Sequence, residues 1–178
     1  MFVRAPGYGS FDSVRCQEGK EGEPLMTYQV VTKTVSARPL AVVRRRALSR
    51  DVGRIWKPAL DLVWEFLRRH EGLRADGHNC FLYHFPAHSD AAMDIDFGVQ
   101  VIRPFEGEGE VVCTETPAGE VAMTTHVGSY DKLAGAYDAI HSWRAATGRA
   151  FGGCSWEIYG DWTEDTTKLE TQVVYLLS

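Results

Sequence analysis

The chain has 178 residues, of which 44% are hydrophobic, and its formal net charge is -5. This length fits one domain, or two small halves fused into one, with enough apolar material for a core. No apolar run is long enough to span a membrane, and Gly, Arg and Asp interrupt the start, where a signal peptide would need an apolar segment. We therefore expect a cytoplasmic protein without a membrane partner.

The first 25 residues differ in character from the rest. Gly7, Gly9 and Pro24 are among the residues that break any periodicity, and the polar residues between them form no face. We expect a flexible N-terminal extension over residues 1–25. A regular pattern begins at Met26, so translation starts either at Met1 or at Met26, and residues 26–178 form the folded domain.

The second half of the chain repeats the pattern of the first half. Each half has an opening strand, an amphipathic stretch, a tyrosine-bearing strand and a last alternating segment. These segments are residues 40–44, 49–72, 81–84 and 93–102, with counterparts at residues 121–125, 129–148, 157–160 and 169–177. The predicted fold class is α+β. Two tandem pseudo-twofold β-α-β-β repeats, at about 26–105 and 106–178, would form an antiparallel sheet with two helices on one face and a central ligand groove on the other.

The amphipathic stretches have apolar residues at steps of three and four, which predicts one helix in each half. We expect Ser49 to cap the start of the first helix and Gly72 to end it. Ser129 and Gly148 bound the second helix in the same way. Pro58 lies early in the first helix, so the helix either begins after it or bends there.

The two halves differ in charge. Residues 26–105 contain 12 lysines and arginines against 8 acidic residues, whereas residues 106–178 contain 4 against 12. An acidic second half argues against direct nucleic-acid binding. Residues 44–46 are the only basic run; a solvated strand end is the first interpretation and a phosphate site the weaker one.

Cysteine and histidine spacing predicts no metal site and no cofactor. Cys16, Cys80, Cys113 and Cys154 lack CxxC or related spacing, and the six histidines show no ligand pattern. The chain also lacks a glycine-rich phosphate loop and a nucleophile elbow.

Strand alternation assigns side chains of the tyrosine-bearing strands to two faces. We expect Leu82, Ile158 and Trp156 to face the helices, and Trp156 is also a candidate ligand contact. The other face would form a groove with aromatic rings around acidic and amide groups, which favours flat or cationic organic ligands. Its expected lining is Phe81, Tyr83, Asp96, Glu157, Tyr159 and Gln172.

Several segments resemble the GyrI-like small-molecule-binding family, whose members include effector-binding domains of AraC-type and MerR-type transcription regulators. The segments are His126-Val127-Gly128-Ser129-Tyr130, residues 153–159 with their Trp-Glu-Ile-Tyr end, residues 37–44 and residues 94–99. The resemblance covers about residues 26–178. Residues 1–25 are too short and glycine-rich for a helix-turn-helix, so the chain resembles a stand-alone member without its own DNA-binding domain.

The last strand departs from the family pattern. The family's strand usually reads Thr-Glu-Ile/Val-x-x-Pro with the Glu in the cleft, whereas this chain has Gln172 and Leu176 at the matching positions. Glu170 has the same parity as Gln172, so two registers remain open. With Gln172 in the cleft, a neutral ligand is favoured over a cation.

Three functions follow from this resemblance. The first is binding of a small, aromatic or hydrophobic organic molecule for sensing, sequestration or drug resistance, without catalysis. The second is a hydrolase of reactive cyclopropane-containing natural products, in which Glu157 would activate water or protonate the substrate and Tyr159 or Tyr83 would assist. The third is a protein-interaction role such as gyrase modulation, with a protein partner or a homodimer; haem binding is a distant fourth.

Overall fold

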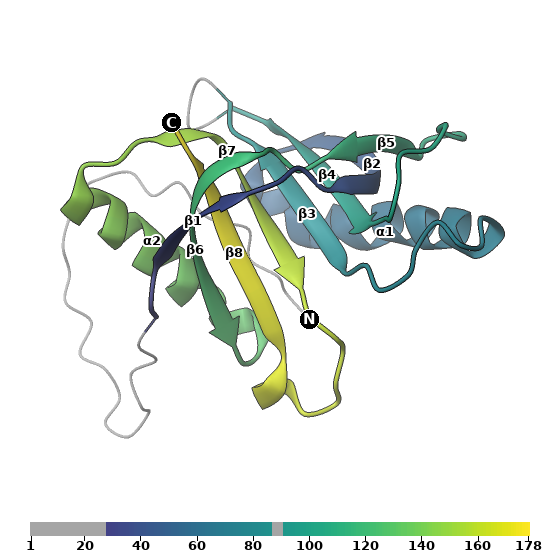
Figure 1. Ribbon diagram of the computed structural model, residues 1–178. Coiled ribbons are helices and arrows are strands. Elements are labelled where there is room, and N and C mark those ends of the chain that lie inside the picture. The colour runs from purple at the N-terminus through teal and green to yellow at the C-terminus, as the bar shows by residue number, and fades with distance from the viewer. Residues whose placement is uncertain (1–27, 87–90) are drawn as a thin grey trace.

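The computed structural model describes residues 28–86 and 91–178, which form one antiparallel sheet and two α-helices (Figure 1). The expected extension over residues 1–25 lies outside the described residues. The strands are β1 (Val31–Val35), β2 (Pro39–Ala47), β3 (Asn79–His84), β4 (Met93–Gln100), β5 (Val112–Glu115), β6 (Gly119–Val127), β7 (Phe151–Tyr159) and β8 (Glu170–Leu177). The α-helices are α1 (Val52–Arg69) and α2 (Ala134–Thr147), and short 3-10 turns are η1 (Ser49–Asp51), η2 (Tyr130–Lys132) and η3 (Thr166–Lys168).

The α+β class and the repeated β-α-β-β order are confirmed, with one exchange between the repeats. The sheet order is β1-β6-β8-β7-β3-β4-β2-β5. The central ladder joins β3 of the first repeat to β7 of the second. At the edges, β1 pairs with β6 and β5 pairs with β2, so each repeat contributes its first strand to the other repeat. The two halves therefore interlock.

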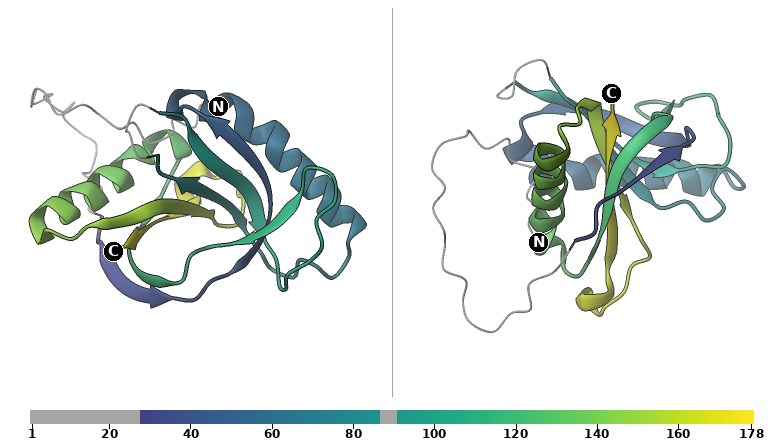
Figure 2. Two further views of the ribbon diagram at one scale, coloured as in Figure 1. Left: turned by 90° about the horizontal axis from the view of Figure 1, so that it is seen from above. Right: turned by 60° about the vertical axis from the view of Figure 1, so that its left-hand side comes forward.

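Both helices cover the same face of the sheet, over opposite halves. Helix α1 contacts β2 and β4, and helix α2 contacts β6 (Figures 1 and 2). The strand registers place Phe97, Phe81, Glu157 and Val173 in one row across β4, β3, β7 and β8. Since directly paired residues share a face and Phe97 packs with α1, this whole row faces the helices.

The expected orientation of the central strands is therefore wrong. Leu82 and Trp156 lie on the face away from the helices, where they pack with Cys80 and Val174 and with the partly buried Ile158. Both faces of β3 carry apolar residues and residues on both faces of β7 are buried, so the sequence pattern alone does not distinguish the faces. The orientation expected for β4 is right, since Ile95, Phe97 and Val99 belong to the cluster beneath α1.

The helix ends agree only in part with the expected caps. Ser49 begins the turn η1 instead of capping α1, and α1 ends at Arg69, before Gly72. Pro58 lies inside α1 without interrupting it. Gly148 is the C-cap of α2 with a left-handed φ of 70°, as expected for a helix-terminating glycine. Neither helix of the described residues is long and apolar enough to cross a bilayer.

Candidate ligand-binding site

A buried carboxylate lies at the centre of the helix-covered face. Glu157, near the end of β7, has only 1% of its surface exposed. Its Oε2 accepts hydrogen bonds from the Tyr83 hydroxyl at 2.7 Å and from the Tyr159 hydroxyl at 2.6 Å. The hydroxyl of Tyr137, from α2, donates to Oε1. Three tyrosines from two strands and one helix thus converge on one acid.

Glu157 has no cationic partner among the described residues; its hydrogen bonds come from neutral hydroxyl groups. Burial raises the pKa of the Glu157 carboxyl above its ordinary value, and the three tyrosine hydrogen bonds offset only part of that rise. Burial and the nearby carboxylate hold the pKa of Tyr83, Tyr137 and Tyr159 well above the ordinary value, so these hydroxyls remain protonated donors. A buried negative charge without a counterion is costly, and a bound cation would reduce that cost.

Glu157 lies at the pseudo-twofold axis that relates the two repeats. The alignment of the repeats that pairs Leu82 with Ile158 also pairs Phe81 with Glu157. In the structure Phe81 and Glu157 lie directly opposite each other in the β3·β7 ladder. The first repeat therefore provides an aromatic ring where the second provides the acid.

An aromatic cavity of about 210 Å³ lies beside this cluster, against α1. Its lining residues are Trp56, Leu60, Asn79, Phe81, Tyr130, Tyr159, Gly160 and Trp162. The ring of Tyr159 packs on Phe81 with centroids 5.0 Å apart and on Tyr130 at 5.5 Å. Trp162 is 72% exposed. Tyr159 belongs to both the cavity and the carboxylate cluster, since its ring lines the cavity and its hydroxyl donates a hydrogen bond to Glu157.

Two further hydroxyl groups on this face have no hydrogen-bond partner among the described residues. They are Ser155 Oγ and Thr171 Oγ1, and both are buried. Ser155 pairs with Tyr83 in the β3·β7 ladder, and Thr171 pairs with Tyr159 in the β7·β8 ladder. Most buried hydroxyl groups in proteins are hydrogen-bonded, so these two add unused polar capacity near Glu157.

The raised pKa of Glu157 predicts a pH dependence of stability. The folded protein holds this proton more tightly than the unfolded chain does, so protonation stabilises the fold at low pH. That contribution is lost as the pH rises above 4.5, the ordinary value, and through the raised pKa. We expect Glu157→Gln, which cannot ionise, to gain stability relative to the wild type across this range. Urea unfolding of both proteins at a series of pH values measures the difference; a difference independent of pH would contradict the prediction.

The structure brings together four of the seven residues expected to bind ligand. Phe81 and Tyr159 line the aromatic cavity, and Tyr83 and Tyr159 donate hydrogen bonds to Glu157. Glu157 and Tyr159 are also the candidates for catalysis. The role of all four in binding or catalysis remains a prediction.

The other three expected residues lie on the opposite face of the sheet, so the seven do not line one groove. Trp156 and Gln172 line a separate cavity there. Asp96 is fully buried and accepts hydrogen bonds from both Nε and Nη2 of Arg44, at 2.6 and 2.8 Å, and lies 2.8 Å from His84 Nε2. Burial alone would raise the pKa of Asp96, but these partners bring it below the ordinary value.

The register of the last strand, left open by the sequence, is settled by its pairing. Gln172 pairs with Ile158 and with Thr125. Glu170 is exposed and pairs with Val127. Both side chains share the face away from Glu157, so neither register would put an acid from β8 beside the tyrosines.

Four residues that line the cavity or contact Glu157 were not predicted from the sequence to do so. Tyr137 lies on the apolar stripe of α2, which indicates a core position, and its hydrogen bond to Glu157 has no sequence signal. Trp56 lies on the corresponding stripe of α1, and Tyr130 follows the His-Val-Gly-Ser segment. Trp162 lies in an irregular loop with no pattern at all.

The comparisons with known proteins identify a family and a shared fold. The family model described as the GyrI-like small molecule binding domain matches residues 28–176. No curated protein is significantly similar to the chain. The C-terminal domain of EcmrR is 22% identical with a TM-score of 0.71, over 86% of this chain and 99% of that one.

Two other solved structures have the same fold at lower identity. SAV2435, solved bound to tetraphenylphosphonium, is 10% identical with a TM-score of 0.63, over 86% of this chain and 94% of that one. A hydrolase encoded by lin2189 from Listeria innocua is 11% identical with a TM-score of 0.60, over 84% of this chain and 92% of that one.

Proposed function

Since the chain belongs to the family of GyrI-like small molecule binding domains, we propose that it binds a small aromatic organic cation in the cavity beside Glu157. The observation that carries this proposal is a buried carboxylate whose hydrogen bonds within the described part of the chain come only from neutral hydroxyl groups. A cation in the adjoining cavity would supply the missing opposite charge. The biological role that fits is sensing or sequestration of such a molecule.

The walls of the cavity suit the same class of ligand. Trp56, Phe81, Tyr130, Tyr159 and Trp162 present aromatic rings, and a cation within reach of an aromatic face gains about 0.5–2 kcal/mol from the ring quadrupole. The volume of about 210 Å³ lies below the usual range for drug-sized ligands, which favours a compact molecule with one aromatic ring.

A structural neighbour lends support from its bound ligand. SAV2435 binds tetraphenylphosphonium, an aromatic cation, in a protein with this fold. Tetraphenylphosphonium is therefore a second probe for the present chain. Because it is larger than a single-ring cation, its binding would require the Trp162 loop or α1 to move.

The test compares two molecules of the same shape that differ in charge. Phenyltrimethylammonium and tert-butylbenzene are titrated into protein labelled with fluorotryptophan, which gives one ¹⁹F signal for each of the five tryptophans. We expect the cation to bind about tenfold more tightly and to shift the signals of Trp56 and Trp162. Equal or tighter binding of tert-butylbenzene would overturn the preference for cations. Absence of any shift with both probes and with tetraphenylphosphonium would overturn the site.

A further inference from the structure

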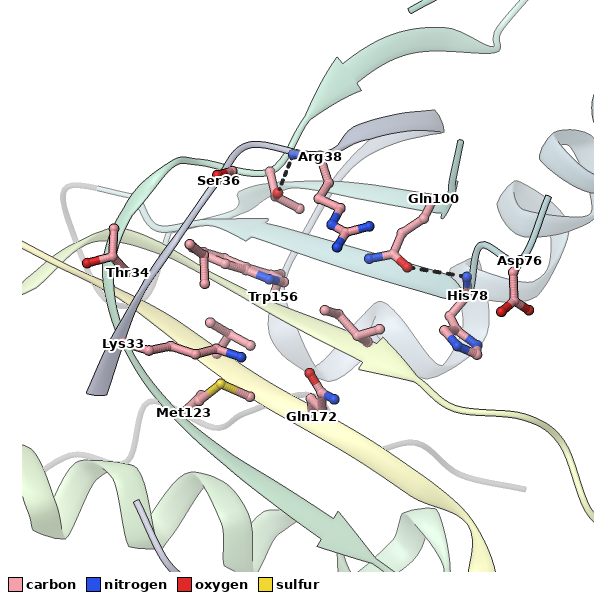
Figure 3. A pocket seen from close by; sticks show the side chains of 14 residues that line it. Lys33, Thr34, Ser36, Arg38, Asp76, His78, Gln100, Met123, Trp156 and Gln172 are labelled. Carbon is pink, nitrogen blue, oxygen red and sulfur yellow. Dashed lines mark hydrogen bonds between the residues drawn. The ribbon is translucent and has the colours of Figure 1, made fainter. Parts of the chain in front are cut away.

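A second cavity, of about 520 Å³, lies on the face of the sheet away from the helices (Figure 3). Its floor is apolar and consists of Met123, Trp156, Ile158 and Val174 from three neighbouring strands. The amides of Gln100 and Gln172 stand at its sides. The cavity is separated from Glu157 by the sheet itself.

The sheet pairing explains why positive charge gathers over this floor. Lys33 pairs with Val121 in the β1·β6 ladder, and Val121 belongs to the apolar cluster of this face. Lys33 therefore shares the face with Trp156. Arg38 lies in the connection between β1 and β2, and its backbone N–H donates to Thr116 Oγ1 at 3.0 Å, which anchors the connection to the segment after β5.

The close-up view shows both cations directed into the cavity. The Lys33 ammonium lies above Met123 and Gln172, and the Arg38 guanidinium points from the other side toward Gln100 (Figure 3). Neither side chain forms an ion pair with any described residue. Among the described residues that line the cavity, Asp76 is the only acidic one, and it lies beside His78.

Lys33 and Arg38 have no ion-pair partner in the described part of the chain and lie over an apolar floor, so this cavity favours a ligand of opposite charge to the one expected beside Glu157. The protein has a net charge of -5, so positive charge concentrated at one cavity is not a property of the surface in general. The amide groups of Gln100 and Gln172 can donate hydrogen bonds to an acid without adding charge. The indole of Trp156 offers a flat apolar surface for the rest of the ligand.

We propose that this cavity is a second ligand site, which binds a small organic anion consisting of a carboxylate on a flat apolar body. The carboxylate contacts Lys33 and Arg38, and the apolar body packs on Trp156 and Met123. An inorganic anion such as phosphate would leave the apolar floor uncovered and is disfavoured. The domain then has two sites of opposite charge preference, one on each face of the sheet.

The test uses naphthalene carboxylate and its uncharged amide, which have the same apolar body. Protein labelled with fluorotryptophan is titrated with each compound, and the Trp156 signal is assigned by its loss in Trp156→Phe. We expect the carboxylate to shift the Trp156 signal and to bind at least about tenfold more tightly than the amide. The signals of Trp56 and Trp162 should stay in place, which distinguishes this site from the one beside Glu157.

Charge-removing variants complete the test. Lys33→Met and Arg38→Met should each weaken carboxylate binding about tenfold, because each removes a charged hydrogen-bond donor. Both residues are exposed, so the fold should be retained, and the melting temperature checks this. Lys57→Met, on the exposed side of α1, is the matched control and should bind as the wild type does. Equal binding of the acid and the amide, unchanged binding in both variants, or tight binding of inorganic phosphate alone would overturn the proposal.

Discussion

Replacing Glu157 with glutamine is expected to weaken the binding of phenyltrimethylammonium by about thirtyfold or more and to leave that of tert-butylbenzene unchanged. Removing one partner of a buried charge pair typically costs about 2–5 kcal/mol of binding free energy. Glutamine has nearly the shape of glutamate, so the loss reflects charge and not packing. Isothermal titration calorimetry at neutral pH measures both affinities.

The control for this variant is Glu170→Gln, which makes the same chemical change at an exposed residue on the other face of the sheet. We expect its affinity for the cation to equal that of the wild type. Tyr83→Phe provides an intermediate test, since it removes one of the three hydrogen bonds while the charge remains. Undiminished cation binding by Glu157→Gln would mean that the carboxylate does not recognise the ligand.

Replacing Gly98 with alanine is expected to lower the free energy of unfolding by about 2–3 kcal/mol, because the core would be overpacked. A Cβ atom at this position would lie 2.4 Å from the carbonyl oxygen of Ala41 and 2.5 Å from Cγ1 of Val42. Gly98 pairs with Val42 on one side and Cys80 on the other, so the strands cannot separate without breaking two ladders. For a domain of this size we expect the melting temperature to fall by about 5–10 °C.

Gly72→Ala separates the steric effect from the loss of glycine. Gly72 has a φ of 78°, and a Cβ atom added there would meet no other atom within 4 Å. The alanine variant should lose only about 1 kcal/mol, the cost of a left-handed residue with a side chain. A Gly98→Ala protein as stable as the wild type, by urea or thermal unfolding, would show that β2 and β4 can shift without cost.

The repeated order of strands and helices could be predicted because it rests on local patterns. Steps of three and four mark α1 and α2, and strict alternation oriented β4, where Asp94 and Asp96 alternate with apolar residues. Neither signal depends on which strands are neighbours. The exchange of β1 and β5 between the repeats, in contrast, is a matter of which strands are neighbours. Short strands of four or five residues contain no information about a distant partner.

Four residues of the site were predicted from the sequence, but the face of the sheet on which they lie was not. Strand β3 has Phe81 and Tyr83 on one face and Leu82 on the other, so both faces are apolar. The register resolves the choice, because Phe81 lies opposite Phe97 and Phe97 was correctly oriented. Sequence alone gives no register, and an error of one residue moves every side chain to the other face. Tyr137 was missed since a tyrosine on an apolar helix stripe looks like any core residue.

The order of strands in the sheet has a consequence for how the protein is made. Strand β8 lies between β6 and β7 and is the last of the eight strands to leave the ribosome. Until it is in place, no ladder joins β1 and β6 to the rest of the sheet, and the edges of β6 and β7 that flank β8 are unpaired. Val173 and Tyr175 of the same strand pack beneath α2, the helix whose Tyr137 holds Glu157. Strand β8 therefore both joins the two parts of the sheet and packs against the helix that provides one of the three partners of the carboxylate.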